Sequence, residues 1–240
     1  YPRTNLMYCM KTLSGNTVIT SYNPVTDALV ETVGTITGTS SNGIYPRPFR
    51  HPQDDILYFG ADNVVATLNN TTFTAAALTL SEGLTITSFT DYGVYLAIAC
   101  APKNASEKSF VYLWNRDTSL ATVQETIDFG VGALMVLENV AGSLVGISAV
   151  TQLAAAAEMV FQINPKLVFR EYTGGLARPF KEWRWTGTGT PTIRLENLKA
   201  KQNDALFFAF NNYYERQTLN MLGVVFKNAR GRLVVTADRL

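Results

Sequence analysis

Charge, histidine and cysteine are all scarce in this chain of 240 residues. Charged side chains make up 16% of it and the formal net charge is +1, which excludes the strong positive field of a general nucleic-acid binder. A single histidine excludes a multi-histidine metal site, and two cysteines are too few for a disulfide scaffold or a zinc site. We therefore expect no metal and no cofactor, and we interpret Cys9 and Cys100 as buried free thiols.

Long apolar runs are also missing. The longest, near residues 149–161, is interrupted by Thr151, Gln152 and Glu158, and it falls well short of the roughly 20 apolar residues that span a bilayer. No membrane segment is expected. A starting methionine is absent and little chain precedes the first apolar run. We therefore expect either that the chain is a piece of a longer polypeptide or that its ring is closed by something outside it.

Strand-forming residues, by contrast, are abundant and arranged in a repeat. Five apolar runs end in an asparagine, and successive asparagines lie 46, 46, 49 and 64 residues apart: Asn23, Asn69, Asn115, Asn164 and Asn228. Asparagine tolerates positive φ and bonds its own backbone, so it suits the turn of a hairpin. We predict that each of these asparagines lies at the turn between the third and fourth strands of its unit.

Each unit carries further strand-like runs around its asparagine. One run lies upstream, at 6–10, 56–61, 95–101, 144–149 and 205–210. Another lies downstream, at 28–33, 73–80, 122–127, 167–172 and 233–236. Four units also have a leading segment, at 47–51, 85–89, 133–138 and 191–196. Four short strands repeating at roughly 40–50 residues are typical of a β-propeller blade. The sequence thus predicts a single all-β domain, 1–240, forming a β-propeller of about five four-stranded blades, the first incomplete, in a ring that could be larger.

The longest interval contains an apparent insertion, residues 174–203, in the last repeat. Its first part holds two of the three tryptophans beside three cationic side chains: Arg178, Lys181, Trp183, Arg184 and Trp185. Long loops on a rigid scaffold often carry recognition, and tryptophan and arginine are enriched in binding hot spots. We predict that these five residues form an interface with a neighbouring subunit or with another protein of the same assembly. Two alternatives stay open: the indoles cover the end of the propeller, or they stack on nucleic acid locally.

The sequence indicates a protein that is not an enzyme. His51 stands close to Asp54 and Asp55, which would suit an acid–base dyad, but no nucleophile accompanies them. A carbohydrate-binding or glycosidase-like propeller is the alternative from another class, because carboxylates fall in or beside the leading strands that line a propeller channel: Asp54, Asp55, Asp91, Glu138 and Glu196. The aspartate-box turn of sialidase-like repeats is absent. A peptide-binding scaffold is the third interpretation.

Several runs carry a resemblance to a known group of proteins. Residues 87–99, 111–117, 125–130 and 144–148 resemble the propeller repeats of tailed-bacteriophage virion proteins, and the region 56–172 is similar to the tail hub or nozzle of short-tailed phages. The resemblance implies a structural role in the virion tail, with subunits joined in a homo-oligomeric ring. It also implies docking to other virion or tail proteins and non-specific passage of DNA through the ring.

Overall fold

The computed structural model describes most of the chain, namely residues 5–39, 46–104, 107–140, 142–149, 159–160, 166–184, 192–193, 196–201, 205–212, 217–227 and 232–239. Throughout these residues the regular structure is β-strand, with no α-helix, which confirms the prediction of an all-β chain. In the same residues no helix of the length and hydropathy needed to cross a membrane is present.

Antiparallel hairpins connect the strands within each sheet. Sheet 1 has three strands, β1 (Met7–Leu13), β2 (Asn16–Asn23) and β3 (Ala28–Ile36). Sheet 2 has four, β4 (Phe49–Arg50), β5 (Leu57–Ala61), β6 (Val64–Asn69) and β7 (Thr72–Thr79). Sheet 3 also has four, β8 (Leu84–Tyr92), β9 (Tyr95–Pro102), β10 (Lys108–Trp114) and β11 (Glu125–Val131). In each sheet the strands lie in chain order, as in a propeller blade.

The second half of the chain continues the pattern. Sheet 4 consists of β12 (Ala133–Val140), β13 (Ser143–Ala149), β15 (Lys166–Tyr172) and β16 (Arg178–Arg184). Sheet 5 consists of β18 (Glu196–Lys201), β19 (Ala205–Asn212), β20 (Gln217–Lys227) and β21 (Arg232–Arg239). A separate two-stranded sheet pairs β14 (Met159–Val160) with β17 (Thr192–Ile193). Four of the sheets thus have four antiparallel strands.

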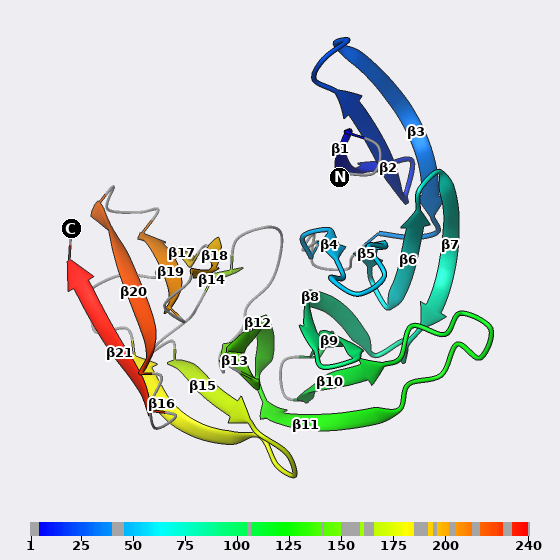
Figure 1. Ribbon diagram of the computed structural model, residues 1–240. Helices are drawn as coiled ribbons and strands as arrows, with labels where there is room; N and C mark the ends of the chain where they lie inside the picture. The colour runs from blue at the N-terminus through cyan, green and yellow to red at the C-terminus, as the bar shows by residue number, and fades with distance from the viewer. Residues whose placement is uncertain are drawn as a thin grey trace.

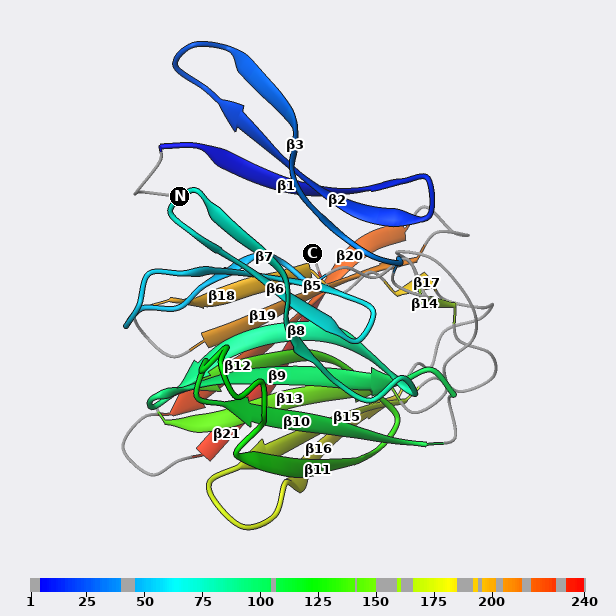
Figure 2. The same ribbon diagram turned by 90° about the vertical axis from the view of Figure 1, so that its right-hand side faces the viewer.

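The five larger sheets follow one another round an open arc, with sheet 1 at one end and sheet 5 at the other (Figure 1). The first strand of each four-stranded sheet, namely β4, β8, β12 or β18, lies on the inner side of the arc, and the last strand lies on the outer side. The view turned by 90° shows the first four sheets stacked as layers (Figure 2). The arrangement is propeller-like.

Both faces of β9, in the internal sheet 3, are buried, which explains why this strand is apolar without alternating polar positions. In β9, Leu96, Ile98 and Cys100 pack into a core with sheet 2. The intervening Ala97 and Ala99 pack into the next core, with sheet 4. Successive side chains of a strand point to opposite faces, so one short strand contributes to two hydrophobic cores.

Where two sheets meet, glycines of one sheet leave room for large side chains of the next. A Cβ built on Gly60 of β5 would lie 3.0 Å from Ile86 Cγ2 and from Phe89 Cζ of the next sheet. A Cβ on Gly146 of β13 would lie 2.7 Å from Phe129 Cε1 of sheet 3. Glycine at these positions allows close approach of the sheets. The aromatic side chain of one sheet therefore lies directly against the backbone of its neighbour.

Three of the five repeat asparagines lie where the sequence predicts. Asn23 closes the β2–β3 hairpin and Asn69 the β6–β7 hairpin, while Asn115 directly follows β10. The Asn23 Oδ1 accepts a hydrogen bond from Val25 N at 2.9 Å, and Asn115 Oδ1 accepts one from Asp117 N at 3.0 Å. Side-chain-to-backbone bonding of this kind is the turn chemistry that the prediction used. Asn164 and Asn228 lie outside the described residues.

Two expectations are wrong. Residues 167–172 were expected to form the fourth strand of their unit, but β15 is the third strand of sheet 4. The fourth strand is β16, which lies inside the segment interpreted as an insertion, because the third strand comes later in this repeat than the asparagine spacing suggests. Cys100 is buried and free as predicted, whereas Cys9 is free but exposed.

The close contact at Gly146 predicts a specific cost. Gly146→Ala should lower the free energy of unfolding by about 1–3 kcal/mol, because the new methyl group would press on Phe129 and on Leu134 Cδ1 at 2.8 Å. Gly83→Ala is the matched control, since a Cβ there meets nothing within 4 Å and the backbone needs no positive φ. Urea unfolding of both variants measures the difference. Equal stabilities would contradict the close-packing account.

Candidate functional site

The polar cluster with the most connections surrounds the one histidine, in the turn between β4 and β5. His51 N donates to Ile56 O at 3.1 Å, and Asp55 N donates to His51 O at 3.0 Å. Asp54 Oδ1 accepts from Ile56 N at 2.9 Å, and Asp55 adopts a φ of 57° that aspartate tolerates well. The short segment from His51 to Ile56 thus folds on its own backbone, and the side chains of His51 and Gln53 reach carbonyl oxygens of sheet 3 and its β8–β9 turn.

His51 is completely buried, and both of its ring nitrogens are occupied. Nδ1 lies 3.3 Å from Gln53 N and 2.5 Å from Arg116 Nη1, both of which are donors, so Nδ1 is the acceptor. The proton therefore resides on Nε2, which donates to the carbonyl oxygen of Tyr95 at 3.3 Å. The neutral imidazole bridges sheet 2 and sheet 3.

Arg116 holds the other side of the cluster. Its Nη1 donates to Asp54 Oδ2 at 2.7 Å and its Nη2 donates to Gln53 Oε1 at 3.2 Å. Tyr58 adds a second donor to Asp54 Oδ2, at 3.0 Å. Arg116 has a φ of 70°, a conformation that is unfavourable for a residue with a long side chain. The guanidinium bonds across the two sheets compensate for that backbone strain.

Electrostatics in the cluster favour a fixed protonation state. Burial, and then the positive charge of Arg116, lower the pKa of His51 below its ordinary value. Burial, and then the negative charge of Asp54, raise the pKa of the Tyr58 hydroxyl well above its usual range. His51 is therefore neutral and Tyr58 protonated near neutral pH, which are the states that the hydrogen bonds require.

The sequence suggested a dyad of His51 with Asp54 or Asp55, and the structure does not bring such a dyad together. Arg116 Nη1 bonds both His51 and Asp54, so the guanidinium joins the two side chains. Asp55 is paired instead with Arg50, at 3.0 Å. Because the histidine has no ring nitrogen available, this cluster cannot accept a proton from a substrate in the described geometry.

A second set of polar contacts ties the inner strands β8 and β12. Thr87 Oγ1 donates to Leu134 O at 2.6 Å, and Ser88 Oγ donates to Leu137 O at 3.2 Å. Asn139 completes the set, because its N donates to Thr90 Oγ1 at 3.2 Å and its side chain to Asp91 Oδ2 at 3.3 Å. Partners in these bonds lie 47 to 49 residues apart, which is the length of one repeat. The inner strands of sheets 3 and 4 are thus joined by side-chain hydrogen bonds, most of them made by hydroxyl groups.

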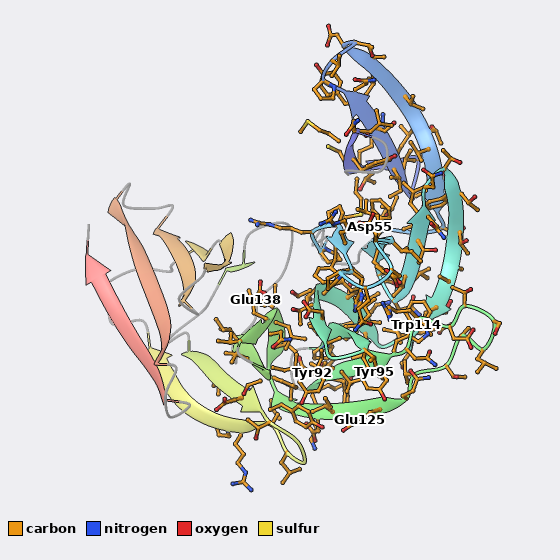
Figure 3. The ribbon with its side chains drawn as sticks, viewed as in Figure 1. Asp55, Tyr92, Tyr95, Trp114, Glu125 and Glu138 are labelled. Carbon is orange, nitrogen blue, oxygen red and sulfur yellow. The ribbon has the colours of Figure 1, made fainter. Side chains whose placement is uncertain are left out.

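The five carboxylates considered for a glycosidase-like site come to lie in different surroundings. Asp54 is bound to Arg116, Asp55 to Arg50 and Asp91 to Asn139. Glu138 lies on inner strand β12 and is nearly buried, at 9% exposed. Figure 3 shows Asp55 and Glu138 on the inner side of the arc. Glu196 lies on strand β18, and its side chain lies outside the described part of the structure.

Tyrosines tie sheet 3 to sheet 4 farther out. The Tyr172 hydroxyl donates to Glu125 Oε1 at 2.6 Å, and the Tyr172 ring packs edge-on against Tyr92 with centroids 6.1 Å apart. The hydrogen bond to Glu125, followed by burial, raises the pKa of Tyr172 to about 12. Figure 3 shows Glu125 on the outer strand β11 and Tyr92 farther inward. These contacts serve the packing of sheets.

The predicted interface residues lie on strand β16, apart from Trp185, which lies outside the described residues. Trp183 pairs with Leu167 and Lys181 with Phe169. Both residues therefore belong to the last strand of sheet 4. Arg178 is exposed at the start of the strand. The segment is thus a strand for these residues, where a loop was expected.

Sequence reasoning missed Arg116, the residue that organises the histidine cluster. It lies 65 residues from His51 and 62 from Asp54, so no local motif joins them. The position directly after the repeat asparagine was the one available signal, because it places Arg116 at a hairpin turn beside the neighbouring unit. Within the described part of the chain, no group of three or more histidine, cysteine, aspartate or glutamate side chains could hold a metal ion.

Comparison with known proteins gives a likeness in fold. No family model and no curated protein matches the chain. Among solved structures, polysaccharide lyase Uly1 is similar, with a TM-score of 0.51 and 10% identity over 96% of this chain and 70% of that one. A protein of unknown function from Bacteroides caccae matches with a TM-score of 0.38 and 10% identity, over 97% and 93%. A puromycin-hydrolyzing peptidase of Mycobacterium tuberculosis matches with a TM-score of 0.44 and 9% identity, over 98% and 39%. At this identity the lyase shows a shared fold alone.

The histidine cluster predicts how stability depends on pH. The pKa of His51 is lowered on folding, so below the ordinary histidine value of 6.5 the unfolded chain binds a proton that the folded chain does not. The free energy of unfolding should be constant above that pH and fall below it, by at most about 1.4 kcal/mol per pH unit. Urea unfolding at pH values from about 8 to about 5 measures the slope.

The variant His51→Gln is the control for this measurement. Because the chain has one histidine, removing it should abolish the fall in stability close to the histidine pKa. Carboxylate titration at lower pH should remain in both proteins. A wild-type slope that persists in His51→Gln would show that another group carries the pH dependence.

Proposed function

We propose that this chain is a non-enzymatic structural component of a phage virion, in which its sheets act as blades of a β-propeller of about five units. In this role the inner strands form the wall of a conduit for DNA in a tail hub or nozzle. The outer strands and turns give neighbouring tail proteins a docking surface. The propeller-like arc of sheets supports the blade interpretation.

The observation that carries the proposal is the use of polar side chains for holding sheets together. His51, Arg116 and Asp54 tie sheet 2 to sheet 3. Thr87, Ser88 and Asn139 belong to the ties between sheets 3 and 4. Catalytic groups need free lone pairs or protons directed at a substrate, whereas these groups are bound to one another. An arc stabilised in this way suits a mechanical role.

Charge supports a conduit wall more than a DNA-binding groove. The net charge of +1 over 240 residues gives little of the lysine and arginine excess through which proteins bind phosphates tightly. Near the histidine cluster, the positive charge of Arg116 is paired with Asp54 and that of Arg50 with Asp55. A surface with paired charges would let DNA slide past without holding it.

The glycosidase-like alternative receives no support from the contacts of Asp54 and Asp91. Such an enzyme needs one carboxyl group to give a proton to the leaving oxygen and a second to act as base or nucleophile. Asp54 is fixed by Arg116 and Tyr58, and Asp91 accepts from Asn139. These contacts occupy the carboxylates with partners from the protein itself. The scaffold interpretation therefore accounts for them more simply.

The location of the protein tests the proposal directly. Quantitative mass spectrometry of purified particles should find the chain at a fixed, small copy number relative to the major capsid protein. Cell lysate cleared of particles is the control and should be depleted of the chain after assembly. A protein found as a free monomer in the lysate and absent from particles would contradict the virion role.

The residues of β16 give a second test of the same proposal. Replacing Trp183 and Trp185 together by alanine should weaken incorporation into particles and leave the melting temperature of the isolated chain nearly unchanged, because aromatic hot spots act mainly on binding. If Trp183 instead packs toward sheet 5, the change should cost roughly 3–5 kcal/mol of stability. Thermal unfolding measured beside incorporation separates the two, and a collapse of stability would rule out the interface role.

A further inference from the structure

A surface hollow between sheets 2 and 3 lies away from the histidine cluster. Its volume is about 420 Å³, within the range of pockets that hold small ligands. The connection from β7 to β8 supplies one wall, and the start of β10 supplies the other. Seven residues line it: Ser81, Gly83, Leu84, Glu107, Lys108, Phe110 and Tyr112. Neither the proposed conduit nor the predicted β16 interface uses this hollow.

The floor of the hollow is formed by the same face of β10 that packs into the hydrophobic core. Alternate residues of that strand share a face, and Trp114 at its inner end is fully buried against Tyr58. Phe110 and Tyr112 follow on the same face, where both are half-buried. Their rings lie 6.4 Å apart with an interplanar angle of 38°. The strand therefore presents two tilted aromatic faces at the point where the core meets solvent.

Polar groups surround this aromatic floor. Ser81, Glu107 and Lys108 are exposed at the rim. No described residue hydrogen-bonds the Tyr112 hydroxyl, which leaves a donor and acceptor at the edge of the floor. The two rim charges are of opposite sign, and Lys108 is already paired with Asp128. The rim thus offers hydrogen bonds and no unpaired positive charge for an anionic ligand, and Glu107 Oε1 accepts a hydrogen bond from Asn104 Nδ2 at 3.3 Å.

We propose that this hollow binds a neutral hexopyranose unit of a polysaccharide. A pyranose ring has an apolar face of C–H groups and hydroxyl groups round its edge, which match the aromatic floor and the polar rim. An anionic sugar would meet no unpaired positive charge there. Because the hollow opens to solvent, neighbouring sugar units of a longer chain could continue past the exposed rim. This inference is independent of the proposed virion role.

Binding of neutral oligosaccharides tests the inference. The purified full chain is titrated with maltohexaose, cellohexaose and mannohexaose, and saturation-transfer NMR detects the bound sugar. At least one hexaose should bind. Phe110→Ala should weaken that binding about tenfold or more through loss of the aromatic face, and Tyr112→Phe about fivefold through loss of one hydrogen bond. Tyr22→Phe removes an exposed hydroxyl on sheet 1 and should leave binding unchanged.

One further variant keeps the test valid if Phe110→Ala does not fold. Ser81→Trp fills the hollow from an exposed rim position whose side chain contributes nothing to the core, so it should abolish binding in a stable protein. The inference is overturned if none of the three hexaoses binds the wild type, or if binding survives Ser81→Trp. Tighter binding of oligogalacturonate than of every neutral hexaose would overturn the assignment to a neutral sugar.

Discussion

The structure depends on the burial of both faces of each internal sheet. A strand such as β9 must fill a core on either side, with Leu96, Ile98 and Cys100 on one face and two alanines on the other. The large side chains of one sheet therefore meet small residues of the next, as Phe129 meets Gly146. Sheets packed in this way cannot be displaced individually without opening two cores. Each sequence repeat must therefore contain the strands of one complete sheet, and this sets the spacing of the repeat.

Polar contacts then fix how neighbouring sheets are aligned. Apolar packing is not directional, so it leaves the sheets free to slide, whereas hydrogen bonds such as that from Thr87 Oγ1 to Leu134 O hold one alignment. The His51–Arg116 contact does the same between sheets 2 and 3, and it operates only while the imidazole is neutral. The buried histidine thus belongs to the framework of the protein, and its lowered pKa is a consequence of that position.

The same packing leaves partly exposed side chains at the edges where two sheets meet, and such side chains can form binding sites. Core residues between two sheets end at the rim, where the face of β10 that buries Trp114 exposes part of Phe110 and Tyr112. A propeller-like scaffold can in this way combine hydrogen bonds between its inner strands with a hollow between sheets. The fold shared with a polysaccharide lyase at 10% identity says nothing about chemistry, because function depends on the residues placed on a fold.

The sequence by itself determined the class of structure and the position of many turns. Apolar runs of strand length and asparagines such as Asn23, Asn69 and Asn115 act through local backbone preferences, which do not need tertiary information. The order of strands in sheet 4 was decided by tertiary structure, since β15 pairs with β13, whose partner residues lie 18 to 28 positions earlier in the chain. The partners of His51 were decided in the same way. Arg116 contacts His51 only because two sheets built from separate repeats pack face to face. The sequence pattern therefore does not reveal that these two residues are close in space.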